Sequence, residues 1–256
     1  MPAPSARLEL IAVPGLPLVQ AGDDLATLVL AALPAAGLVL QDGDTLAFAQ
    51  KIVSKAEGRM VDLATVVPSP QAADLARLVR KDPRLVELIL RESRRVVRCA
   101  PDVLIVEQRL GFIMANAGVD QSNVAGGGEF ALLLPEDPDA SAARLREAFG
   151  ARAGCDLAVL ITDSFGRPWR QGTAGVAIGC AGLPALVDLR GEPDLFGRRL
   201  RVTTVGHADE VAAAASLLMG QSAEGQPVVL IRGLHCDRPA APAAALLRPA
   251  DEDLFR

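Results

Sequence analysis

The sequence predicts an α+β protein with mixed sheets and packed helices. Short apolar runs typical of buried strands alternate with segments whose apolar residues recur at helical spacing. These segments do not follow the regular strand–helix–strand rhythm of a doubly wound sheet. No G-x-G-x-x-G occurs, and Gln226-Pro227 stands where the glycine spacing of Gly220 and Gly225 would require the Lys-Ser/Thr of a P-loop. We therefore expect neither a Rossmann nor a P-loop fold.

The composition indicates a large apolar core and a reducing compartment. Half of the 256 residues are hydrophobic but only 3% are aromatic, so Leu, Val, Ile and Ala must fill the core. A formal net charge of -5 argues against a nucleic-acid partner. The four cysteines lack zinc spacing, and no secretory signal or membrane-spanning apolar stretch is found. We expect free thiols in a cytoplasmic protein with no membrane partner.

In the first half of the chain, apolar runs bounded by Pro, Gly or Asp predict strands, and apolar residues three or four apart predict helices. Asp23 or Asp24 is suited to cap the first helix. The expected strands are 8–13, 45–53, 103–106 and 111–114, and the expected helices are 25–33, 69–80 and 82–95.

The second half follows the same rules. Gly126-Gly127-Gly128 is expected to be a flexible break, and Asp139 or Ser141 to cap a helix that runs toward Phe149. Segment 172–182 is rich in glycine and segment 188–201 in charge. The expected strands are 130–134, 157–161 and 228–232, and an Ala-rich helix is expected at 207–219.

The residues after the strand 157–161 carry the strongest chemical signal. Asp163-Ser164 is followed by Arg167 and Arg170, which flank the only Trp. An oxygen pair beside fixed guanidinium groups is suited to hold a hard metal ion against phosphate oxygens. The alternative is a turn whose Asp caps a helix and whose arginines lie on the surface.

Other oxygen donors also follow predicted elements. Asp120 and Asn123 follow a strand and a glycine turn, and Gln221 follows the helix 207–219. Their alternatives are an Asx-turn and a polar helix end. Because these clusters contain no thiolate or imidazole, they favour Mg²⁺ or Mn²⁺ over zinc.

Two basic groups are candidates for binding an anion. Lys51 and Lys55 are four residues apart around the expected end of the strand 45–53, where a solvated turn is the alternative. Arg91, Arg94, Arg95 and Arg98 would form one stripe if the helix continued to Arg98, where a solvated helix face is the alternative. The β-branched Val96 and Val97 weigh against such an extension.

Six blocks of the sequence, in order along nearly the whole chain, resemble the coenzyme F420-0:L-glutamate ligase family, also called the gamma-glutamyl ligases. Among them are the Lys51–Arg59 run, the run that contains Asp120 and Asn123, and the run from Asp163 to Arg170. The matching blocks are residues 22–24, 51–59, 115–123, 134–139, 163–170 and 177–179.

The resemblance implies an F420 ligase-like fold and a GTP-dependent ligase. Such an enzyme would join L-glutamate, and a further gamma-linked glutamate, to the deazaflavin precursor F420-0 through an acyl phosphate, with release of GDP and phosphate. It also implies two divalent ions per site, Mg²⁺ or Mn²⁺, K⁺ as an optional further ion, and a homodimer. We expect a ligase domain over residues 1–245, with two lobes, and a tail over 246–256.

Carried over residue by residue, the resemblance places the metal ligands at Asp120, Asp163, Ser164 and Gln221. The family more often has Thr at position 164, and both residues present a hydroxyl. The implied GTP contacts are Gly15, Leu16, Pro17, Leu18, Lys51, Lys55, Asn123, Met219, Gly220, Gln221, Ser222, Ala223, Glu224, Gly225 and Gln226. Lys55 is also expected to be catalytic, and charge and position add Arg167 and Arg170 to that role.

The alternatives to this function are a kinase or an amide ligase that acts on another carboxylate, and a deazaflavin- or nucleotide-binding module without turnover.

Overall fold

The computed structural model describes residues 7–124, 126 and 128–253, so position 127 of the expected glycine break and the end of the expected tail lie outside the described residues. The helices are α1 (Leu25–Ala32), α2 (Gln50–Ala56), α3 (Pro70–Val79), α4 (Pro83–Arg91), α5 (Pro138–Ala153) and α6 (His207–Met219), with 3-10 turns η1 (Leu33–Ala36), η2 (Leu63–Thr65), η3 (Asn116–Gly118), η4 (Ala243–Leu246) and η5 (Ala250–Glu252). The strands are β1 (Glu9–Ala12), β2 (Thr45–Ala49), β3 (Met60–Asp62), β4 (Ser93–Ala100), β5 (Val103–Gln108), β6 (Ile113–Ala115), β7 (Phe130–Leu132), β8 (Ala158–Arg167), β9 (Arg170–Ala181), β10 (Val187–Asp188), β11 (Thr204–Val205) and β12 (Val228–Arg232).

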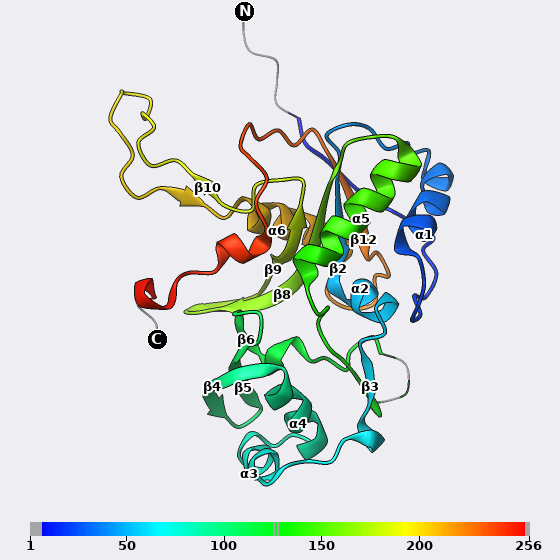
Figure 1. Cartoon of the computed structure of the whole chain (residues 1–256), viewed down its shortest axis with the longest axis vertical. Helices are drawn as coiled ribbons and strands as arrows, with labels where there is room; N and C mark the ends of the chain where they lie inside the picture. The colour runs from blue at the N-terminus through cyan, green and yellow to red at the C-terminus, as the bar shows by residue number, and fades with distance from the viewer. Residues whose placement is uncertain (1–6, 125, 127, 254–256) are drawn as a thin grey trace, which may run out of the picture.

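A five-stranded mixed sheet forms the main body, in the order β1-β12-β2-β8-β9 (Figure 1). Only β2 and β8 are parallel neighbours, and the other pairs are antiparallel. Phe48 of β2 packs in the apolar cluster that includes α1 and α5, whereas the adjacent Ala47 packs against α6. Because both faces of β2 are covered, its sequence is apolar almost throughout rather than alternating.

A third apolar cluster lies below the main sheet in Figure 1, around the antiparallel sheet β4-β5-β6. Helices α3 and α4 cover one face of this small sheet and contribute Val79, Val86 and Ile89 to its core. The pair β3-β7 lies beside it, and the arm that contains β10 and β11 projects from the main body. The mixed α+β class expected from the sequence is confirmed.

Several expected elements are confirmed. The helix 207–219 and the strand 228–232 occur with the expected bounds. Asp24 caps α1, since its carboxylate accepts hydrogen bonds from Ala26 N and Thr27 N. All four cysteines are free. No helix in the described part of the chain is long and apolar enough to cross a membrane.

The expected strand 45–53 is wrong in its second half. The strand ends at Ala49, and the apolar run continues as helix α2. Ala49 donates its backbone N–H to Pro227 O at 2.8 Å, outside the ladder. A short apolar run has the same composition whether it forms a strand or a buried helical turn, so composition alone did not separate the two.

The expected helix 82–95 ends at Arg91, so the stripe of four arginines does not form. Residues from Ser93 to Ala100 form β4, in which Val96 pairs with Val106 of β5. The β-branched pair at 96 and 97 is placed in a strand, as its propensity favours. Arg95 and Arg94 instead form ion pairs with Glu107, at 2.8 and 3.6 Å.

One further expectation in the second half is wrong. Asp137, rather than Asp139 or Ser141, caps α5 by accepting a hydrogen bond from Ala140 N. Asp139 accepts hydrogen bonds from the backbone of Cys180 and of residues 243 and 244, and so joins α5 to β9 and η4. The glycine-rich segment 172–182 forms most of β9, the longest strand of the sheet.

Candidate active site

The candidate site lies at the edge of the main sheet where the parallel strands β2 and β8 end. Helix α2 begins directly after β2, and β8 continues to Asp163 and beyond. The neighbouring strands reach the same edge: Val13, after β1, donates its N–H to Val228 O of β12 at 2.9 Å. Carboxyl ends of neighbouring parallel strands are a common place for ligand binding, because loops from distant parts of the sequence converge there.

Asp163 lies within β8, which continues to Arg167 in pairing with β9. The alternative of a turn with a helix-capping Asp is therefore wrong. Asp163 is half-buried, and its loss of hydration raises its pKa to about 6, an effect that the negative charge of Asp120 increases. The hydrogen bond from Ser164 N, at 2.8 Å, and the charge of Lys51 act in the opposite direction. The two carboxylates thus influence one another although they are far apart in the sequence.

Asp120 is positioned by an unusual turn. Asn116, Ala117 and Gly118 all have left-handed backbone angles, with φ of 54°, 54° and 72°. A Cβ at Gly118 would lie 2.6 Å from Leu134. Left-handed geometry in non-glycine residues costs about 1–2 kcal/mol each, and such strain concentrates near functional sites.

The carboxylate of Asp120 accepts several hydrogen bonds. Lys51 Nζ donates to Oδ2 at 2.6 Å, and Ser122 donates from its hydroxyl and its N–H, each at 2.8 Å. Burial acts to raise the pKa of Asp120, but the bonds from Lys51 and Ser122 outweigh it and hold the pKa below its usual value. Asp120 is therefore an anion that is already bound to a cation.

A hydroxyl and an amide oxygen meet one residue further along β8 from Asp163. Ser164 Oγ donates to Gln221 Oε1 at 2.7 Å, and Gln221 follows the end of α6. Helix α6 can approach β9 closely because a Cβ at Gly175, opposite Ser164, would lie 2.4 Å from Ala212 O. Our sequence reading did not single out Gly175, although an isolated glycine inside a strand is a known signal of close backbone approach.

Both lysines lie on helix α2, not around a strand end as we expected. Four residues apart on a helix, Lys51 and Lys55 share a face. Lys55 Nζ donates to Asn123 O at 2.7 Å, and Asn123 Nδ2 donates to Ser222 O at 2.9 Å. Burial, then the charge of Lys51, lowers the pKa of Lys55. These contacts join α2, the turn after Asp120 and the segment after α6.

The donor set fits a hard divalent cation. Asp120, Asp163, Ser164 and Gln221 offer two carboxylates, a hydroxyl and an amide oxygen, which suit Mg²⁺ or Mn²⁺. Among the described residues no three His, Cys, Asp or Glu side chains gather into a metal-binding group. Mg²⁺ commonly takes one or two carboxylates and completes its shell with substrate phosphates and water, so two carboxylates are enough.

Other expected site residues are not joined to this centre by the contacts described. Residues 15–18 follow Val13 near the start of β12, and Leu18 is 90% exposed. Arg167 is four residues beyond Asp163 along β8, about 13 Å at the usual rise of a strand. Arg170 begins β9 at the exposed tip of the same hairpin, opposite Arg167.

The remaining positions expected to contact GTP surround Gln221. Glu224 folds back on this segment and accepts a hydrogen bond from Ser222 N at 2.8 Å. Gly220 has φ of 70° and ψ of -174°, a backbone conformation that is essentially confined to glycine, which explains the glycine there. The other members of the segment are Met219, Ala223, Gly225 and Gln226.

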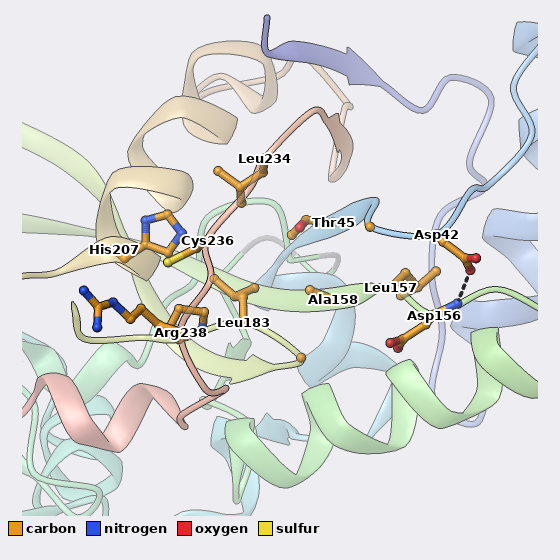
Figure 2. A pocket seen from close by; sticks show the side chains of 13 residues that line it. Asp42, Thr45, Asp156, Leu157, Ala158, Leu183, His207, Leu234, Cys236 and Arg238 are labelled. Atoms are coloured by element: carbon orange, nitrogen blue, oxygen red, sulfur yellow. Dashed lines mark hydrogen bonds between the residues drawn. The ribbon is translucent and has the colours of Figure 1, made fainter. Parts of the chain in front are cut away.

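A cavity of about 340 Å³ lies elsewhere on the main body, where β2, β8 and α6 begin. His207, Cys236 and Arg238 line one end of it, and Asp42 and Asp156 line the other (Figure 2). None of the expected metal or nucleotide residues lines this cavity or a second one of about 410 Å³. The candidate site is therefore separate from both cavities.

Oxygen donors suited to a hard cation, beside two lysines at one sheet edge, are typical of proteins that bind phosphate groups. Residues 15–233 match the family described as F420-0:gamma-glutamyl ligase, and the chain belongs to this family. It is 49% identical to a protein of Methanothermobacter thermautotrophicus over 97% of this chain and 99% of the relative. It is 48% identical to one of Methanopyrus kandleri over 93% of each chain, and 40% identical to one of Archaeoglobus fulgidus over 98% and 97%. All three relatives are named coenzyme F420:L-glutamate ligase.

Proposed function

We propose that this protein is a GTP-dependent ligase that joins L-glutamate to F420-0 and releases GDP and phosphate. The observations that carry the proposal are the Lys51–Asp120 hydrogen bond, the action of both charges on Asp163, and the Ser164–Gln221 hydrogen bond one residue further along β8. Membership of the family and the names of its close relatives support the choice of substrates.

The reaction would proceed in two steps. An oxygen of the acceptor carboxylate attacks the γ-phosphorus of GTP, the bond to the β-phosphate oxygen breaks, and GDP leaves. The amine of glutamate then attacks the carbonyl carbon of the acyl phosphate and expels phosphate as the new amide forms. Catalysis of phosphoryl transfer depends mainly on positioning and on charge stabilisation, both of which this site offers.

Each residue has a role in this proposal. Lys55 contacts the phosphate oxygens as a point charge, and Asn123 with segment 219–226 and the loop 15–18 holds the nucleotide. Asp120, Asp163, Ser164 and Gln221 would hold the divalent ions, which supply charge neutralisation of the triphosphate. Arg167 and Arg170 stabilise negative charge from the hairpin if the hairpin closes over the substrates.

The test is mass spectrometry of the products from GTP, F420-0 and excess L-glutamate with Mg²⁺ or Mn²⁺. We expect the acceptor to gain one or more glutamate residues, with one GDP and one phosphate for each. Reactions without glutamate separate the alternatives: a kinase would release a phosphorylated acceptor, and a binding module would leave GTP intact. The number of residues added with excess glutamate gives the length of the chain that the enzyme builds.

A further inference from the structure

Lys51 lies against an oxygen of Asp120 that a bound metal ion would need as a ligand. Its ammonium group lies 2.6 Å from Oδ2 of Asp120, with 27% of the Lys51 side chain and 38% of the Asp120 side chain exposed. The same Oδ2 also accepts the hydroxyl of Ser122 at 2.8 Å. Both bonds use lone pairs of an oxygen that the proposed cation site requires.

The charge of Lys51 acts on both carboxylates of the site. It forms a direct hydrogen bond with Asp120, and its field also reaches Asp163. Lys55 adds a second positive charge one helical turn away. An ammonium and a divalent cation on one carboxylate would repel each other strongly at this spacing, so they compete for Asp120.

We propose that Lys51 is an internal counter-ion of the divalent-cation site: it neutralises Asp120 while the site is empty, and it leaves Asp120 for the phosphates of the nucleotide when a cation binds. This inference rests on the proposed function and assigns Lys51 a second role in it. Lys51 is thereby a positioning residue for cation loading as well as a nucleotide contact.

The structure offers the lysine a place to move. A lysine side chain is a flexible four-carbon stem with a strongly hydrated charge, and Lys51 and Lys55 share one face of α2. Lys55 already reaches the turn at Asn123, where the nucleotide is proposed to bind. A triphosphate bound there gives both ammonium groups an anion to pair with. Cation and nucleotide should therefore each strengthen the binding of the other.

The test measures Mn²⁺ binding to the full chain without nucleotide, by the electron paramagnetic resonance of free Mn²⁺. Lys51→Met removes the competing ammonium and keeps a similar side-chain length. Lys55→Met is the matched control, since it removes the same charge one turn away but does not contact a carboxylate. We expect Lys51→Met to tighten Mn²⁺ binding about tenfold or more, as a charge-assisted hydrogen bond commonly contributes at least that factor. We expect less than about threefold for Lys55→Met, because its ammonium pairs with the backbone oxygen of Asn123 and, unlike Lys51, does not act on the pKa of Asp120 or Asp163.

A second measurement uses the unaltered protein and so does not depend on a variant that folds. Acylation of lysines, read by mass spectrometry, should increase at Lys51 when Mn²⁺ is added and change little at Lys55. Equal Mn²⁺ affinity in the three proteins, or labelling of Lys51 that Mn²⁺ leaves unchanged, would overturn the counter-ion role but leave the ligase proposal standing. Failure of the unaltered protein and both variants to bind Mn²⁺ at millimolar concentration would overturn both proposals.

Discussion

At the scale of single residues, the raised pKa of Asp163 makes the stability of the protein depend on pH. Its pKa in the folded protein is about 6, against 3.8 for an ordinary aspartate. The folded state therefore binds this proton more tightly than the unfolded state. The resulting stabilisation is fully present below about pH 3.8 and is lost as the pH rises through about 6. At neutral pH the ionised, half-buried carboxylate destabilises the metal-free protein, and a bound cation would offset that effect.

Asp163→Asn should therefore make the metal-free protein more stable at pH 7.5, by up to about 3 kcal/mol for a shift of roughly two pKa units. The amide oxygen can still accept the hydrogen bond from Ser164 N. The same variant should lose most turnover and most of the stabilisation by Mn²⁺, because a neutral amide binds a divalent cation weakly. Thermal unfolding with and without Mn²⁺ measures both effects. A variant stabilised by Mn²⁺ as much as the original protein would remove Asp163 from the ligand set.

At the scale of elements, the approach of α6 to the β8–β9 hairpin sets where Gln221 meets Ser164. The contact depends on Gly175, because a side chain there would meet the backbone of Ala212. Gly166 lies in the same hairpin, has no left-handed backbone angle and has no atom within 4 Å of its added Cβ. The pair offers a comparison in which the same substitution is made in crowded and in open space.

Gly175→Ala should lower the free energy of unfolding by about 1–3 kcal/mol, since overpacking forces the backbone to shift. It should also weaken Mn²⁺ binding, because α6 carries the segment that holds Gln221. Gly166→Ala should change the free energy of unfolding by less than about 0.5 kcal/mol. Denaturant titration and Mn²⁺ binding of both variants test this. Equal stability of the two variants would mean that α6 does not need the close contact.

At the scale of the whole molecule, an ionic network joins the small sheet to the main body. Arg59, three residues after α2, donates to Leu134 O at 2.9 Å and forms ion pairs with Glu92 and Glu136, each at 3.2 Å. Glu92, at the end of α4, also pairs with Arg109 at 3.0 Å. Glu92 is 12% exposed and Arg59 17% exposed, whereas Glu136 is 75% exposed.

Glu92→Gln should destabilise the protein by about 3 kcal/mol, because it leaves two cations near one another without their shared anion. Glu136→Gln removes a carboxylate from the same Arg59 and should cost less than about 1 kcal/mol, since that pair is exposed to solvent. Urea unfolding of both variants measures the difference. Similar losses in the two variants would show that burial does not strengthen this network.

The assembly and boundaries expected from the sequence stay predictions. These are the homodimer, the two-lobed domain 1–245 and the tail 246–256. Analytical ultracentrifugation addresses the first.

The sequence by itself determined the elements whose signals are local. Helix α6 and strand β12 have the bounds that spacing and turn residues predict, and Asp24 caps α1 as its type suggests. The sequence also predicted the family correctly, because the motifs around Lys51, Asp120 and Asp163 are short and continuous. These features depend on residues within a few positions of one another, which a sequence displays directly.

The tertiary structure alone decided where β2 ends and α2 begins, and that β8 continues past its apolar run. It also decided that Lys51 forms an ion pair with Asp120, 69 residues away. An apolar run fits a strand or a buried helix equally well until its partners are known. Likewise, a lysine and an aspartate reveal nothing about their pairing until the fold brings their charges together. Long-range pairing, burial and charge are properties of the folded surroundings, and they set both the strand ends and the electrostatics of this site.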